Sequence, residues 1–260
     1  MTDPVQRSIA QRIAIILAVI VQVGASYLPE LGYGEPIGNR SDGLRTVITP
    51  VGWAFAVWGP LFAGSVIFAV WQALPNQRNN ALLDRIGWWA VPALGLQGVW
   101  AAYTQFSTLT AISALIITGA LVSLLAILRT MVFFPRQFTK QERLFVTIVF
   151  SALAGWLTAA TIVNITASLV YYGVAGGYEY PLVGALLVLV GGAIVAVAVA
   201  RSMGNPWYAL TFGWALLGIF MQGGKESSAV AAACGLAAAL VASAVWLGLR
   251  VPGNARRWFD

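Results

Sequence analysis

Long uninterrupted apolar runs constrain this chain more than any other feature of its sequence. A helix that crosses a bilayer needs about 20 apolar residues, and we count eight such runs bounded by charges, Pro and Gly. They cover residues 8–28, 50–73, 86–106, 109–128, 144–171, 181–200, 206–222 and 228–249. Barrel strands would instead alternate over about ten residues. The sequence predicts an all-α, polytopic transmembrane bundle of about eight spans that contact the lipid bilayer directly.

The basic residues test this span count independently, because Lys and Arg concentrate in cytoplasmic loops. Of the 15 basic residues, only Arg40, Arg45 and Lys225 lie on the side opposite the N-terminus. The other twelve share the side of the N-terminus: Arg7, Arg12, Arg78, Arg85, Arg129, Arg136, Lys140, Arg143, Arg201, Arg250, Arg256 and Arg257. We therefore expect a multi-pass protein of the bacterial inner membrane with both termini cytoplasmic.

Composition excludes several classes of function. The basic charge follows membrane topology, so a pI of about 9.8 is no sign of nucleic-acid binding. The chain has no His and one Cys, Cys234, which removes imidazole ligands for metals and haem iron, the Ser-His-Asp triad and an internal disulfide. All acids fall at or outside span ends, so paired catalytic carboxylates and ion-coupling acids are missing. We expect no enzyme.

Aromatic and polar side chains gather in the outer half of three spans, at depths of about 5 to 14 Å for most of them. Amides in hydrocarbon must pair across helices or line a cavity, and bulky indoles on facing helices keep a space open. Pro60 and Pro92 are expected to kink their helices and widen it. The predicted ligand-binding residues are Trp53, Phe55, Trp58, Phe62, Gln97, Trp100, Trp156, Thr161 and Asn164. Helix-to-helix pairing of Gln97 and Asn164 is the alternative.

The loop from Pro29 to Thr49 is the longest outer segment and is rich in Gly, Pro and charge. Its length allows it to cover the outer mouth of the bundle, so we expect it to form a lid.

The sixth and eighth spans differ from the others. Gly184, Gly191 and Gly192 and the Ala-rich run 229–244 suit close helix packing.

Three stretches resemble a known family. Pro50-Val51-Gly52-Trp53-Ala54-Phe55-Ala56-Val57-Trp58, followed by Phe62, is similar to the Pro-Pro-x-Trp-x-Phe-x-x-x-Trp-x-x-x-Tyr pattern of the translocator protein or tryptophan-rich sensory protein family, TspO/MBR. Gln97-Gly98-Val99-Trp100 resembles its Asn-x-x-Trp. Trp156 precedes Asn164 by eight residues, as in its fifth helix. Departures are Val51, Phe62, Gln97 and Ala152-Leu153, which stands where the family has Pro-Tyr.

The resemblance implies a five-helix core over residues 1–172, with residues 173–260 as a three-helix extension that has no counterpart in that core. It also implies a cavity, closed by the first loop, for a flat hydrophobic molecule such as a porphyrin or another tetrapyrrole, used in sensing, regulation or transport. Without His, a metal-free or weakly ligated tetrapyrrole is the better expectation.

Two other functions stay open from the sequence. The chain could be a non-catalytic accessory subunit or assembly factor of a larger membrane complex, pigment-bearing or not, docked through the last three spans. A secondary transporter is less favoured, because intramembrane acids and an inverted repeat are missing. A homo-oligomer is compatible with each of these functions.

Overall fold

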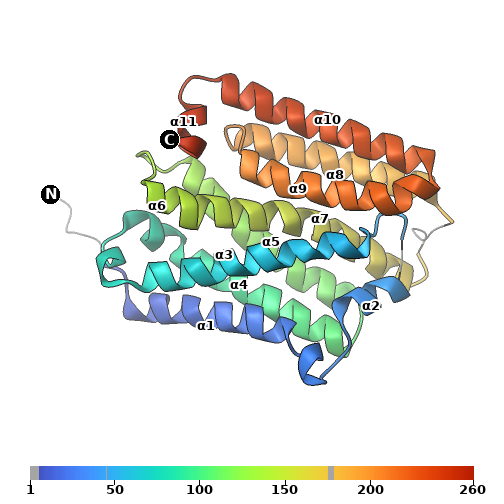
Figure 1. Cartoon of the computed structure of the whole chain (residues 1–260), viewed down its shortest axis with the longest axis horizontal. Helices are drawn as coiled ribbons and strands as arrows, with labels where there is room; N and C mark the ends of the chain where they lie inside the picture. Colours follow the sequence, from blue (N-terminus) through green and yellow to red (C-terminus); the bar gives the residue numbers. More distant parts are fainter. Residues whose placement is uncertain (1–5, 45, 175–178) are drawn as a thin grey trace.

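The computed structural model describes residues 6–44, 46–174 and 179–260, and all regular structure in them is helical (Figure 1). The eight long helices of this part are α1 Ile9–Ser26, α3 Trp58–Ala73, α4 Ala81–Phe106, α5 Ala111–Val132, α7 Ile148–Tyr171, α8 Pro181–Arg201, α9 Pro206–Ile219 and α10 Ser228–Arg250. The predicted helical bundle is confirmed.

Shorter elements join these helices. The short α-helices are α2 Ile37–Gly43, α6 Lys140–Glu142 and α11 Asn254–Phe259. The 3₁₀ turns are η1 Pro29–Leu31, η2 Gly52–Val57 and η3 Pro75–Gln77, and the π-helical turns are η4 Arg143–Thr147 and η5 Phe220–Gly224.

Among the described residues, six helical stretches are long and apolar enough to cross a membrane. They are Ile9–Ser26, Gly52–Ala73, Ala111–Val132, Lys140–Tyr171, Pro181–Arg201 and Ser228–Arg250. The remaining two long helices lie alongside them in the same bundle (Figure 1). Helix α4 has 26 residues but carries buried amides, and α9 has 14 residues continued by the five of η5.

A capping side chain explains where α4 begins, which the apolar run alone did not predict. The Asn80 side chain accepts from the backbone N–H of Leu82 and Leu83, at 3.0 and 3.1 Å, so α4 begins at Ala81 rather than at residue 86. The kink expected at Pro60 stays a prediction. Pro60 lies in the first turn of α3, where its missing N–H removes no hydrogen bond within that helix. Pro92 does lie inside α4.

Helices α8, α9 and α10 form one side of the bundle and α1 and α4 the other, with α3 and α7 between them (Figure 1). Helix α9 joins the two sides by packing closely on α7, because Gly155 leaves no Cβ against the backbone of Tyr208. Three polar contacts cross this interface. Thr211 Oγ1 donates to Ala152 O, Tyr208 Oη bonds Thr158 Oγ1, and Asn205 Nδ2 donates to Ser151 Oγ, each at 2.8 Å.

The loop before α3 covers the end of the bundle at which α1 finishes and α3 begins, which confirms the predicted lid (Figure 1). We call residues 29–49 the lid segment, and of it the structure describes all but residue 45. Glu35 N donates to Gln105 O at 3.0 Å, and Arg40 Nη2 donates to the same carbonyl at 3.3 Å. An ion pair of 3.1 Å between Arg40 and Glu35 braces α2 over the end of α4.

A buried turn, Thr46–Thr49, anchors the far end of the lid segment against the last three long helices. The Thr49 hydroxyl accepts from Thr46 N at 3.0 Å, and Val51 N donates to Gly218 O at 3.1 Å. The Val47 backbone approaches Gly223 so closely that a Cβ there would clash with the carbonyl. Gly223 of the three-helix extension thus leaves room for the Thr46–Thr49 turn. The sequence did not indicate this role.

Candidate ligand cavity

Four aromatic rings from η2, the start of α3 and the middle of α7 form one cluster at the lid end. Trp156 receives two rings edge-on, Phe55 and Trp58, each with centroids 5.9 Å apart. Phe62, one turn after Trp58, lies 5.1 Å from it. Such edge-to-face pairs fix ring orientations. The cluster therefore forms a rigid aromatic wall.

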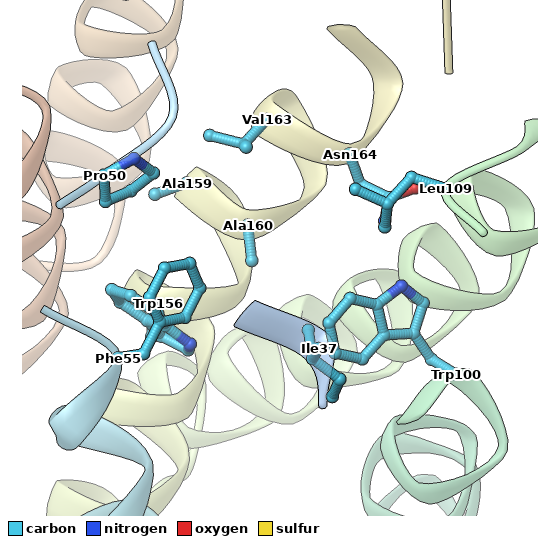
Figure 2. A pocket seen from close by; sticks show the side chains of 10 residues that line it. All are labelled: Ile37, Pro50, Phe55, Trp100, Leu109, Trp156, Ala159, Ala160, Val163 and Asn164. Atoms are coloured by element: carbon cyan, nitrogen blue, oxygen red, sulfur yellow. The ribbon is translucent and has the colours of Figure 1, made fainter. Parts of the chain in front are cut away.

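An inner hollow of about 40 Å³ lies against this wall. Figure 2 shows Trp100 of α4 on the side opposite Phe55 and Trp156, with Ile37 of the lid segment between them and Asn164 and Leu109 beyond. Its remaining lining residues are Pro50, Ala159, Ala160 and Val163. Small Ala side chains on α7 leave the space that the rings border.

An outer hollow of about 320 Å³ adjoins the first, because Ile37 and Trp100 line both. Its walls come from α3, α4 and the lid segment, and they include Trp58, Phe62 and Gln97. The lid segment contributes Pro29, Glu30, Pro36 and Ile37. The outer hollow is therefore bordered by both the lid segment and the aromatic wall.

Three residues that line the inner hollow carry buried hydrogen-bond donors without partners. Within the described residues, Trp100 Nε1, Trp156 Nε1 and Asn164 Nδ2 have no acceptor, and the three side chains are 6%, 2% and 2% exposed. Asn164 Oδ1 does accept from Ser113 Oγ at 2.9 Å, which fixes the amide. Burying an unpaired donor costs about 1–3 kcal/mol. An acceptor oxygen on a bound molecule would offset that cost.

Gln97 both pairs with another helix and lines the outer hollow. Its Oε1 accepts from Gln22 Nε2 of α1 at 2.9 Å, and its Nε2 donates to Ala93 O at 2.6 Å. Both amides are buried, at 0% and 3% exposed. Both expectations therefore hold for Gln97: it pairs with another helix, and it lines a hollow.

The structure does not bring Trp53 or Thr161 to either hollow. Trp53 lies in the 3₁₀ turn η2 and is 44% exposed, with its ring edge-on to Trp214 at 5.2 Å. Trp214 Nε1 donates to Ala54 O at 2.8 Å and so ties η2 to α9. Thr161 is buried on α7, and among the described residues its hydroxyl has no hydrogen-bond partner.

Several residues at or beside the hollows were not predicted. Gln22 lines neither hollow but holds Gln97, and it could have been found, since it is an amide within an apolar span, as Gln97 is. Ile37 gave no signal, because an apolar residue in a loop does not reveal which cavity it enters. Pro50 opens the stretch that resembles the family motif, but it was not predicted to line the cavity. The same holds for the alanines of α7.

Comparison with known proteins identifies the family of the chain. A family model described as TSPO-like protein matches residues 8–247, nearly the whole chain. The chain belongs to the TSPO-like family. The match continues beyond residue 172 and so includes the last three long helices of this TSPO-like protein. Comparisons with curated proteins and with solved structures give no match.

Proposed function

We propose that this TSPO-like membrane protein binds a flat, mostly apolar molecule of the tetrapyrrole class between the aromatic wall and Trp100, for sensing, regulation or transport. One observation carries the proposal: indoles from α3, α4 and α7 border adjoining hollows, and two of them have buried N–H groups without acceptors.

The chemistry of these groups fits a porphyrin. Its wide π face suits the rings of Trp58, Trp100 and Trp156, and its peripheral carboxylates are acceptors for Trp100 Nε1 and Asn164 Nδ2. A tetrapyrrole, with its four pyrrole rings and their substituents, is too large for the inner hollow of about 40 Å³ alone. The outer hollow, about 320 Å³, lies at the lower end of the range of about 300–1,000 Å³ for ligand sites. A bound tetrapyrrole therefore displaces Ile37 and spans both hollows.

The test is a titration of protoporphyrin IX into the protein in lipid nanodiscs, followed by porphyrin absorbance. Trp100→Phe keeps an aromatic ring but removes the indole N–H. We expect it to raise Kd about tenfold, because a hydrogen bond to a charged acceptor contributes about 1.5 kcal/mol. Trp58→Ala removes a stacking face and should weaken binding by a similar factor.

Trp88→Phe is the matched control, since Trp88 is exposed on the same helix α4, about 18 Å from Trp100 along its axis. Its Kd should equal that of the unaltered protein. If Trp100→Phe and Trp58→Ala bind with unchanged affinity, or if all three variants weaken binding equally, the proposed site is wrong.

We further propose a non-enzymatic protein of the bacterial inner membrane, with both termini in the cytoplasm. The unequal distribution of Lys and Arg supports this orientation. A green fluorescent protein fused after Asp260 should fluoresce, since it folds in the cytoplasm but not when exported through the membrane unfolded. A dark fusion with an intact chain would contradict the orientation.

A further inference from the structure

A second, separate groove lies between α5 and α8, at the end of the bundle away from the lid. It has a volume of about 800 Å³. Helix α5 contributes Leu125, Leu128, Arg129, Val132 and Phe133, and α8 contributes Ile194, Val197, Ala198, Arg201 and Ser202. Both helices pack on α7. Most of the lining is apolar, and several of its side chains are exposed.

Two arginines border the groove near its open end. Arg129 and Arg201 lie in the last turns of their helices, and both are exposed. Within the described residues, neither guanidinium has a hydrogen bond, an ion pair or a ring contact, and no acid lines the groove. The groove thus combines a mostly apolar lining with two free positive charges.

The groove is short enough to lie within one leaflet of a bilayer. From Leu125 to Arg129 α5 rises about 6 Å, and from Ile194 to Arg201 α8 rises about 10 Å. Half of a hydrocarbon core of about 30 Å is about 15 Å. An acyl chain whose headgroup is held by the arginines can therefore lie along the groove within that leaflet.

We propose that this groove binds one anionic glycerophospholipid, with an acyl chain between α5 and α8 and the headgroup phosphate between Arg129 and Arg201. Basic pockets between membrane helices recognise acidic headgroups in this way. The apolar groove between α1 and α3, of about 730 Å³, provides a contrast. No charged residue lines it, so it offers no headgroup recognition.

Native mass spectrometry of the detergent-purified protein, mixed with equal amounts of phosphatidylglycerol and phosphatidylcholine of matched chains, tests this site. We expect the protein to retain phosphatidylglycerol preferentially. Each guanidinium near the headgroup contributes about fivefold, so Arg129→Gln with Arg201→Gln should reduce the preference about 25-fold. Ala198→Phe keeps both charges but fills the groove, and should reduce retention of the lipid.

The control is Arg78→Gln with Arg256→Gln, which removes two exposed arginines at the same end of the bundle but outside the groove. Thermal unfolding of both double variants verifies their folding. Equal retention of the two lipids by the unaltered protein would overturn the proposal. So would an undiminished preference in the groove variant, or an equal loss in the control, which would indicate surface charge alone.

Discussion

Replacing Gly223 by alanine introduces a methyl group against the backbone carbonyl of Val47. This carbonyl belongs to the Thr46–Thr49 turn, which anchors the lid segment. Because the obstacle is backbone rather than the end of a flexible side chain, the turn itself must move away from η5. The hydrogen bond from Val51 N to Gly218 O, 3.1 Å long, lies next to it and should weaken as well.

The size of the effect follows from the cost of overpacking. Extra methylene groups in a well-packed site cost about 1–3 kcal/mol. At about 1.4 kcal/mol per factor of ten, this raises the fraction of molecules with a detached lid about 5- to 150-fold. Cleavage of a transiently open segment follows that fraction when opening and closing are fast.

Trypsin cleavage after Arg40, identified by fragment mass, measures the opening in detergent micelles. We expect Gly223→Ala to be cut there faster by the factor above, while the bundle keeps its helical circular dichroism. Gly235→Ala is the control, because a methyl group at Gly235 on α10 meets no atom within 4 Å. Its cleavage rate should equal that of the unaltered protein. Equal rates in all three proteins would refute the anchoring role of the turn.

Two substitutions test the polar contacts that fix the cavity walls. Gln97→Leu leaves the Gln22 amide buried without its partner, so thermal unfolding should show a loss of about 1–2 kcal/mol, and adding Gln22→Leu should recover most of it; a larger loss in the double variant would contradict this pairing. Trp214→Phe removes the 2.8 Å hydrogen bond to Ala54 O and should cost about 1 kcal/mol, with porphyrin affinity unchanged. A weaker porphyrin affinity would place Trp53 and Trp214 within the site.

The long helices could be predicted because apolar runs of this length have few alternatives in a membrane. Their starts were less certain, since they depend on single capping residues such as Asn80. The second span differed most from expectation. Six residues near its start, Gly52–Val57, form the 3₁₀ turn η2, with about three residues per turn rather than 3.6, before α3 begins at Trp58.

This change of period accounts for Trp53 but not for every predicted site residue, since Phe55 also lies in η2 and lines the inner hollow, and Thr161 lies in α7 but lines neither hollow. Trp58, Trp100, Trp156 and Asn164 lie within regular helices, and α-helical spacing predicts their depth and face. Trp53 lies in η2, where that spacing does not apply, and its ring faces α9 instead. The lid residues that border the hollows depend on tertiary packing, which no local pattern encodes.

Ile37 belongs at once to the lid and to both hollows. A guest large enough to bridge the two spaces must push this side chain aside and carry α2 with it. The same segment leads through the Thr46–Thr49 turn to α9 and η5. Under the proposed function, we therefore expect a molecule bound in both hollows to shift the lid segment and, through the Thr46–Thr49 turn, the contacts with α9 and η5.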